Sequence, residues 1–142
     1  EPAKKSRRYD RFRGRIMFPI LDEMGRHVGF GGRALGDDTP KYLNSPESVV
    51  FQKRKTLYNM HTAKQAMRRA GRAIVVEGYL DVIAAVTAGF EGTVAPLGTA
   101  LTEEHLQLLW RMTPDPVLCF DGEGPVVVTA EPPICTHVAD VF

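Results

Sequence analysis

The sequence lacks the features of membrane and secreted proteins. It has no apolar run approaching the ~18–20 residues that a membrane-spanning helix needs. Residues 1–5 contain neither an initiator methionine nor an apolar signal core, so we expect no secretory signal and an internal start. The two cysteines, Cys119 and Cys135, have no zinc-ligand spacing and fit a reduced cytoplasmic compartment. A globular protein of one domain, or of two small subdomains, remains.

Basic residues are almost missing from the second half of the chain. Residues 73–142 contain a single Lys or Arg, Arg111, against ten Asp and Glu. Residues 1–72 contain 17 Lys and Arg against seven Asp and Glu. This asymmetry favours a surface that binds a polyanion beside a surface rich in carboxylates, as in enzymes that handle phosphates with metal ions. Two solvated charged faces would give the same composition, so both interpretations stay open.

The first half predicts a small α+β subdomain. An apolar run at 16–20 and an alternating run at 27–35 flank a turn signal, which predicts a β-hairpin. Glycine, proline and asparagine at 36–40 and 44–46 predict loops. The alanines and methionine of residues 62–70 recur at helical spacing, and Gly71 stands at the position of a helix C-cap.

From residue 73 the pattern changes to alternating strands and helices. Short apolar strands are expected at 73–76, 93–96 and 117–120, with helices at 80–88 and after Thr102, a good N-cap. This β-α-β-α-β order predicts a parallel sheet covered by helices. The fold class is therefore α/β, with an α+β basic subdomain over 1–72 and a parallel α/β sheet over 73–124.

Acidic residues follow two of the predicted strands. Glu77 comes directly after the first strand and Asp121 directly after the third, with Asp81 and Glu123 close by. Ligands of open parallel sheets bind beyond the carboxyl ends of the strands, and Mg²⁺ prefers carboxylate oxygens there. A single acid at a strand end is usually a solvated cap, but two such acids beside glycines favour a metal site. The four histidines are scattered and are expected to be structural or on the surface.

Several blocks of this sequence together resemble the bacterial replicative DNA primase family. They are Tyr-Asp-Arg-Phe-Arg-Gly-Arg-Ile-Met-Phe-Pro-Ile (9–20), Gly-Phe-Gly-Gly-Arg (29–33), Thr-Pro-Lys-Tyr-Leu-Asn-Ser-Pro-Glu (39–47), Val-Glu-Gly-Tyr-Leu-Asp-Val (76–82), Leu-Gly-Thr-Ala-Leu-Thr (97–102) and Cys-Phe-Asp-Gly (119–122). The third block is specific to primases. The acidic motifs within 76–82 and 119–122 alone would indicate only the wider Toprim superfamily, which includes topoisomerases and some nucleases.

The resemblance implies roles for the matching residues. Glu77 corresponds to a metal ligand or general acid/base, Asp121 and Glu123 to a metal-binding pair, and Asp81 to the acid that closes the first Toprim motif, assigned to nucleotide binding. Lys41 and Lys53 resemble catalytic basic residues that line the groove for template and incoming nucleotide, and Arg33 is a further phosphate contact. The implied cofactor is Mg²⁺ or Mn²⁺, with zinc expected only in a domain absent from this chain.

The resemblance also implies an activity and partners. The expected function is template-directed synthesis of RNA primers on single-stranded DNA from ribonucleoside triphosphates, in the cytoplasm at the nucleoid and replisome, with no membrane. A replicative helicase is expected to bind through a region that this chain lacks. A different Toprim enzyme, a topoisomerase or nuclease, or a non-catalytic remnant that only binds single strands are the alternatives.

The sequence departs from the family pattern near its end. Position 123 is Glu where the family has Asp, and residues 125–142 show no resemblance. Prolines in this stretch oppose the helix expected there. We interpret residues 125–142 as the result of a frameshift or as a divergent or disordered tail. We therefore expect weak or no primer synthesis from the chain alone.

Overall fold

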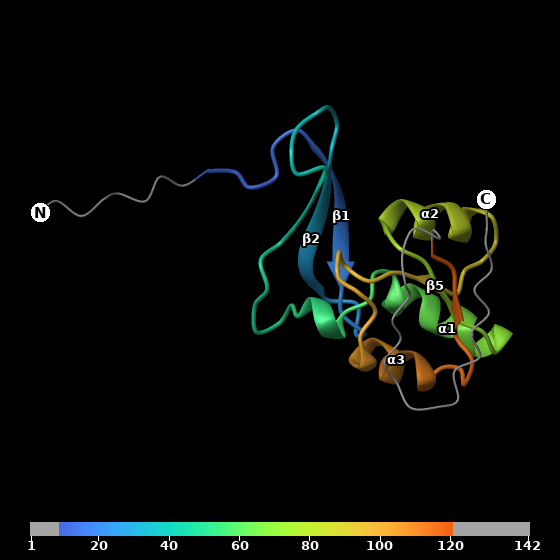
Figure 1. Cartoon of the computed structure of the whole chain (residues 1–142). Helices are drawn as coiled ribbons and strands as arrows, with labels where there is room; N and C mark the ends of the chain where they lie inside the picture. The colour runs from blue at the N-terminus through green and yellow to red at the C-terminus, as the bar shows by residue number, and fades with distance from the viewer. Residues whose placement is uncertain (1–8, 121–142) are drawn as a thin grey trace, which may run out of the picture.

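The computed structural model describes residues 9–120, which form two three-stranded sheets and their helices. The first sheet is antiparallel and consists of β1 (Arg15–Leu21), β2 (His27–Ala34) and β3 (Tyr42–Asn44). Its long β1–β2 hairpin stands beside the helical part of the molecule (Figure 1). The predicted hairpin is confirmed. β3 was not expected, and Asn44, predicted to open a loop, is its last residue.

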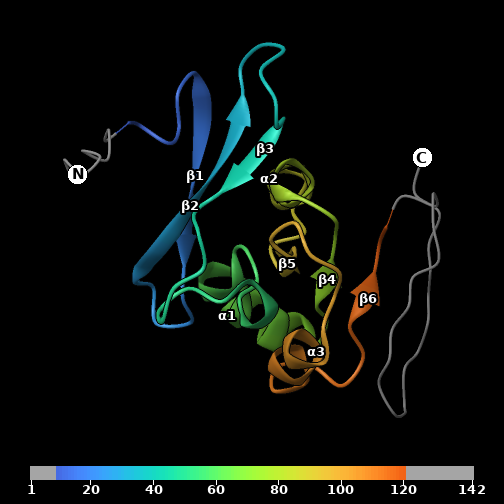
Figure 2. The same cartoon turned by 60° about the vertical axis from the view of Figure 1, so that its left-hand side comes forward.

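The second sheet is parallel, as predicted, in the order β5-β4-β6. Its strands are β4 (Ile74–Val75), β5 (Thr93–Val94) and β6 (Val117–Leu118). Figure 2 shows α2 on one side of this sheet and α1 and α3 on the other. These helices are α1 (Met60–Ala70), α2 (Tyr79–Thr87) and α3 (Glu103–Trp110). The α/β fold is thereby confirmed. In the described part of the chain, no helix is long and apolar enough to cross a membrane.

Capping residues set the helix ends. α1 ends at Gly71, whose φ of 61° lies in the left-handed region that glycine adopts without strain. α3 begins after Thr102, whose Oγ1 accepts from the His105 N–H at 3.2 Å. α1 packs with β4, β5 and α3 in one core, although the predicted boundary at residue 72 grouped it with the basic subdomain. The subdomain boundaries stay predictions.

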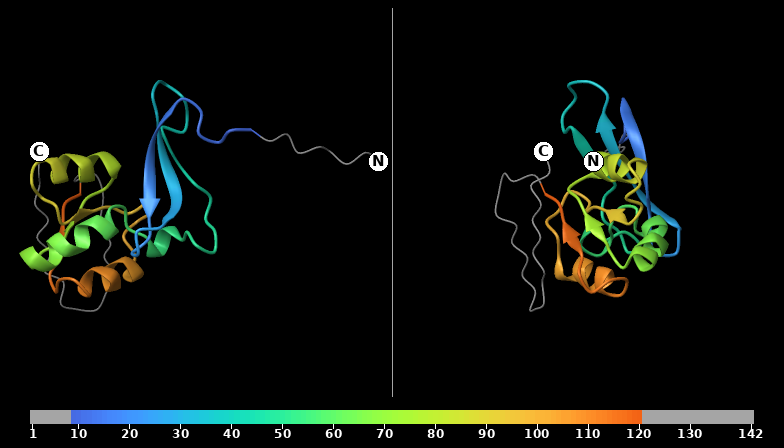
Figure 3. Two further views of the ribbon diagram at one scale, coloured as in Figure 1. Left: turned by 180° about the vertical axis from the view of Figure 1, so that it is seen from behind. Right: turned by 90° about the vertical axis from the view of Figure 1, so that its right-hand side faces the viewer.

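An aromatic cluster joins the two sheets. Phe18 of β1 stacks on Tyr79 of α2 with ring centroids 4.8 Å apart, and Tyr58 packs edge-on to Tyr79 at 4.7 Å. Ile20, Phe51 and Leu97 complete this buried cluster. Burying each large apolar side chain contributes roughly 1.5–3 kcal/mol, so the cluster is a substantial source of the free energy that holds the sheets together. Figure 3 shows from behind that the β1–β2 hairpin lies to one side of the parallel sheet and its helices.

Gly31 of β2 lets this cluster close. A Cβ at residue 31 would collide with the hydroxyl and ring of Tyr79, whereas a Cβ at Gly36 would meet no atom within 4 Å. The ring of Tyr79 therefore lies directly on the backbone of β2. Close approach of a side chain to the main chain is a reason for glycine inside a strand.

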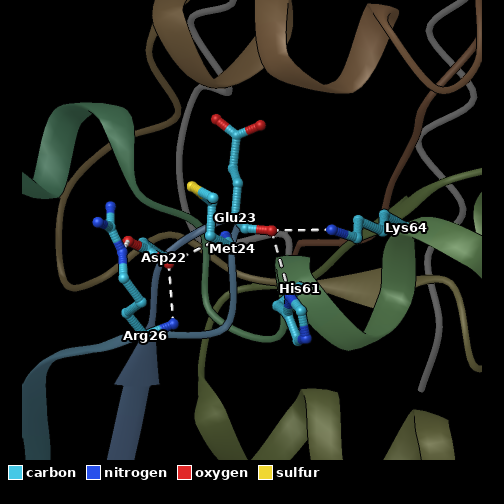
Figure 4. A network of polar contacts seen from close by, with 6 residues as sticks. All are labelled: Asp22, Glu23, Met24, Arg26, His61 and Lys64. Atoms are coloured by element: carbon cyan, nitrogen blue, oxygen red, sulfur yellow. Dashed lines mark hydrogen bonds and ion pairs between the residues drawn. The ribbon is translucent and has the colours of Figure 1, made fainter.

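The turn of the hairpin docks on α1 (Figure 4). Asp22 Oδ1 accepts from the N–H groups of Met24 and Arg26, both at 2.9 Å, which closes the turn. The Glu23 carbonyl then accepts from Lys64 Nζ at 2.8 Å and from His61 Nδ1 at 3.1 Å. The turn is therefore held against the parallel-sheet part at a point away from the aromatic cluster.

A buried histidine provides a third attachment. His105 Nε2 donates to the carbonyl of Lys53 at 2.8 Å, in the short 3₁₀ helix η1 (Lys53–Lys55). His105 Nδ1 accepts from the Thr102 N–H at 3.2 Å, and Thr102 Oγ1 donates to the Arg54 carbonyl at 2.7 Å. This pattern requires the neutral ring, and burial lowers the pKa of His105 below its usual value.

Replacing Gly31 by Ala is expected to destabilise the protein by about 1–3 kcal/mol, because the new methyl group must displace the Tyr79 ring from its stack on Phe18. The measurement is urea unfolding followed by fluorescence. Gly36→Ala is the matched control and should change the free energy of unfolding little, since that site is open. Equal stability of the two variants would contradict the close contact.

Stability is also expected to fall as the pH drops below about 6.5, the ordinary pKa of histidine. The folded-state pKa of His105 is lowered, so the unfolded chain binds the proton first, and the free energy of unfolding decreases from about pH 6.5 down to the folded-state pKa. Asp22 and Glu104 have lowered pKa values and remain ionised in this range.

The check is the melting temperature between about pH 7.5 and 5. His105→Gln should be less stable at neutral pH but should lose this pH dependence. His27→Gln, at an exposed position, should keep it. A wild-type slope that survives in His105→Gln would show that another group is responsible.

Candidate active site

Glu77 lies at the turn from β4 into α2, at the carboxyl edge of the parallel sheet, as predicted. Its side chain is exposed. Gly78 follows in extended conformation as the N-cap of α2, and its N–H donates to Asp81 Oδ2 at 3.1 Å. Asp81 therefore fixes the turn that presents Glu77, since a carboxylate in the first helical turn caps free N–H groups. The assignment of Asp81 to nucleotide binding stays a prediction.

The rest of the predicted metal site lies outside the described residues. Asp121 and Glu123 both follow residue 120, the last one described. β6 pairs with β4 in parallel, with Val75 opposite Leu118, so the described strands leave the sheet at the same edge. Between residues 9 and 120, no group of three His, Cys, Asp or Glu is arranged to hold a metal ion. Glu77 is thus the described member of the predicted set.

Arg33 lies on the face of the antiparallel sheet that meets the aromatic cluster. In the register Arg33 pairs with Tyr42, and Gly31, which contacts Tyr79, pairs with Asn44. Residues directly opposite each other share a face, and positions two apart along a strand share it too. The Arg33 guanidinium lies 6.0 Å from the centre of the Tyr42 ring, and its Nε is buried without a hydrogen-bond partner among the described residues.

Lys41 and Lys53 are each anchored through their own main chain. The Lys41 carbonyl accepts from the Ala34 N–H at 2.9 Å and from Arg15 Nη1 at 3.3 Å. The Lys53 carbonyl accepts from His105, and the Lys53 N–H donates to Glu47 Oε1 at 2.8 Å. None of the hydrogen bonds or ion pairs between described residues uses either ammonium group. The main chain of each lysine is therefore anchored, while its ammonium group stays available to an anion.

Asn44 connects the antiparallel sheet, which carries Arg33, to the turn that carries Glu77. Its side-chain oxygen accepts from the Tyr79 hydroxyl at 2.5 Å, and its side-chain nitrogen donates to the Leu97 carbonyl at 2.9 Å. Burial raises the pKa of Tyr79 well above its usual value, so the hydroxyl stays protonated and can donate. Tyr79 is only two residues from Glu77, and Asn44 only two from Tyr42. This bridge places the face with Arg33 relative to Glu77.

Sequence reasoning missed this bridge and the His105 contacts. Asn44 and Tyr79 lie inside the primase-like blocks 39–47 and 76–82. The resemblance therefore marked both residues, but it gave no indication that their side chains contact each other. His105 lies three residues after the predicted N-cap Thr102, the spacing at which an N-cap and its reciprocal partner meet. That spacing was the available signal for its structural role.

Family models match most of the chain in two parts. Residues 1–64 match the N-terminal domain of the DNA primase catalytic core, and residues 71–130 match the Toprim domain. The DNA primase of Pseudomonas putida is 54% identical over 123 residues, which cover 87% of this chain and 19% of that protein. The DNA primase of Escherichia coli K12 is 52% identical over 119 residues, covering 84% and 20%. The chain thus spans about a fifth of these relatives.

Solved structures agree with this match. A DNA primase domain from Pseudomonas aeruginosa superposes with a TM-score of 0.79 at 53% identity, covering 87% of this chain and 38% of that one. A primase catalytic domain bound to single-stranded DNA gives a TM-score of 0.75 at 53% identity, covering 81% and 37%. The antiparallel sheet and the parallel sheet therefore correspond to parts of a primase catalytic core, and the chain belongs to the bacterial DNA primase family.

Proposed function

We propose that this chain carries part of an active centre for template-directed synthesis of RNA primers on single-stranded DNA. The observation that carries the proposal is the Asn44 bridge, which ties the sheet with Arg33 to the turn with Glu77. Nucleotidyl transfer depends mainly on positioning and on neutralising phosphate charge, so a fixed relation between cations and carboxylates is what the reaction needs.

The basic residues would hold the nucleic acid and the incoming nucleotide. Lys41 and Lys53 offer ammonium groups that no described side chain occupies, and Arg33 offers a guanidinium beside Tyr42. Such groups bind phosphates by charge-assisted hydrogen bonds and release counterions as they do so. Two related structures contain DNA: a primase catalytic domain bound to single-stranded DNA, and a Mycobacterium tuberculosis primase domain in complex with a double-stranded DNA oligomer that has a 6-nucleotide overhang. They support single-stranded DNA as the template.

The family implies a divalent metal, and the described residues fit one in part. Glu77 supplies an exposed carboxylate, a hard oxygen donor, at the edge of the sheet where ligands of parallel sheets bind. Glu77, Asp121 and Glu123 would hold Mg²⁺ or Mn²⁺, which would supply neutralisation of charge at the reacting phosphate. Asp81 contributes by fixing the Glu77 turn through the Gly78 N–H.

The remaining partners follow from the same proposal. Ribonucleoside triphosphates would be the second substrate, and a replicative helicase would be the protein partner. The site of action would be the replisome in the cytoplasm. The match of residues 1–64 to a primase domain argues against a topoisomerase or nuclease.

A second candidate function is binding of single strands without catalysis. It is favoured by the ammonium groups of Lys41 and Lys53, which no hydrogen bond or ion pair between described residues uses and which could bind phosphates without a metal. In that case Lys41 and Lys53 would contribute to the affinity for single-stranded DNA, and Glu77 would bind no metal ion and would not contribute to that affinity.

Lys41→Ala and Lys53→Ala are expected to weaken binding of a fluorescent oligodeoxythymidylate and to lower the slope of log affinity against log salt by about 0.7 per lost phosphate contact. The measurement is fluorescence anisotropy at several salt concentrations. Arg111→Gln removes a cation from the acidic half and is the control, with no expected change in slope. Unchanged slopes in both lysine variants would contradict the proposal that Lys41 and Lys53 contact the phosphates of the nucleic acid.

Glu77→Gln separates the two candidate functions. Mn²⁺ should broaden the NMR signals of the Val76 and Gly78 amides in the unaltered chain, and this broadening should disappear in Glu77→Gln, which loses the anionic ligand. Oligonucleotide affinity should not fall, because the change removes a negative charge. Glu103→Gln, an exposed acid in the first turn of α3, is the matched control. Broadening that persists in Glu77→Gln would remove this residue from the metal site.

A further inference from the structure

A cavity of about 530 Å³ lies at the opposite edge of the parallel sheet from Glu77. It is bounded by the last turns of α1, the start of β4 and the connection from α2 to β5, with Ala66, Arg69, Arg72, Ile74, Phe90 and Glu91 among its lining residues. Its volume lies within the range of small-molecule sites, roughly 300–1,000 Å³. The strands begin at this edge, whereas the predicted metal site lies where they end. The cavity is therefore separate from that site.

Gly89, Phe90 and Gly92 line one side of the cavity. Gly89 has a φ of 97°, a conformation that side chains rarely adopt. A Cβ at Gly92 would stand 3.1 Å from the carbonyl oxygen of Arg72, a tight contact that would require one of the two to shift by a few tenths of an ångström. Phe90, between them, is 57% exposed and is among the large apolar residues that the fold leaves in contact with solvent. An aromatic ring beside an open cavity is a ready stacking surface for a planar group.

The charged residues of the cavity differ in whether they form an ion pair. Arg69 Nη2 donates to Glu91 Oε2 at 2.9 Å, so these two side chains hold each other. Arg72 forms no ion pair with any residue between 9 and 120. The cavity thus offers an unpaired guanidinium and an exposed carboxylate, paired with Arg69, whose remaining lone pairs can accept from an amino group.

We propose that this cavity binds one nucleotide, with its base on Phe90 and its phosphate at Arg72. Stacking of a base on an aromatic ring next to a cation is how single-stranded nucleic acid is held without a duplex. Glu91 would accept from the amino group of the base, as carboxylates do with cytosine. An acidic peptide would meet the same carboxylate without offering it the amino group of a planar base, so the cavity favours a nucleotide over such a partner.

The nucleotide could belong to a strand or be free. This inference rests on the proposed function in one respect, that the chain handles nucleic acid, and it adds a second contact at the far edge of the sheet. For an extended strand, the cavity would hold a segment away from the predicted catalytic residues. For a free nucleotide, it would be a ligand site of its own.

The test is amide NMR of the whole 142-residue chain, titrated separately with oligodeoxycytidylate, deoxycytidine monophosphate and an acidic Glu/Phe peptide. We expect the Gly89 and Gly92 amides to shift with a nucleotide probe. Shifts with the oligonucleotide alone assign the cavity to a strand, and shifts of equal affinity with the monophosphate assign it to a free nucleotide. No shift with either, or shifts with the peptide instead, would overturn the proposal.

Variants then separate the two contacts. Phe90→Ala and Phe90→Leu should each weaken binding of whichever nucleotide probe shifts Gly89 and Gly92 by about fivefold or more, measured at those amides, through lost stacking. The leucine variant keeps an apolar side chain and guards against misfolding. Arg72→Gln should lower the salt slope by about 0.7 for a strand, and Arg111→Gln should not. Unaltered affinity in the Phe90 and Arg72 variants would also overturn the proposal.

The same spectra keep this inference distinct from the proposed function. Shifts of the Lys41 and Lys53 amide signals would indicate binding at the proposed groove, and shifts of the Gly89 and Gly92 amide signals would indicate binding in the cavity. Cavity shifts without groove shifts would support the nucleotide site while contradicting the proposed function. Groove shifts without cavity shifts would do the reverse.

Discussion

The relation between the two sheets depends on the side chain of Asn44. Its half-buried amide accepts from Tyr79 and donates to the Leu97 carbonyl, and both partners belong to the buried cluster of aromatic and aliphatic side chains. An amide that loses partners on burial costs more than a hydrogen bond gains, so an arrangement of the sheets that misses either partner is penalised. The apolar cluster is a substantial source of the free energy of docking, and Asn44 favours the orientation in which both of its partners are met.

Charge alone could not fix that orientation. The basic and acidic halves attract each other, but attraction between exposed charges is weakly directional and is screened by salt. Short-range contacts at three places do the positioning: the Asn44 bridge, the Glu23 carbonyl on α1, and His105 under η1. Three separated points define the placement of one body on another. The exposed ion pairs Arg54–Glu104 and Arg111–Glu23 are longer, at 3.8 and 3.7 Å, and add little.

Local signals in the sequence predicted most of the fold. The hairpin, the three helices and the three parallel strands followed from periodicity, from Gly71 and Thr102 as caps, and from glycine and proline punctuation, although each parallel strand is shorter than expected. β3 could not be predicted because three residues show no alternation, and Tyr42–Asn44 is a strand only through its pairing with β2. Glu77 could be placed at a strand end from order alone. The Asn44 contacts span 35 and 53 residues, a distance that no local pattern encodes.

The two predicted lysines are held in the same way. Lys41 and Lys53 are held by hydrogen bonds to their main-chain carbonyls, from Ala34 and Arg15 in one case and from His105 in the other. An ion pair to the side chain would fix the position equally well, but it would neutralise the charge that a phosphate must meet. Anchoring the backbone leaves the ammonium unpaired and limits its range. Arg33 differs, since its guanidinium rests on Tyr42 and its buried Nε has no described acceptor, so it is positioned through its side chain.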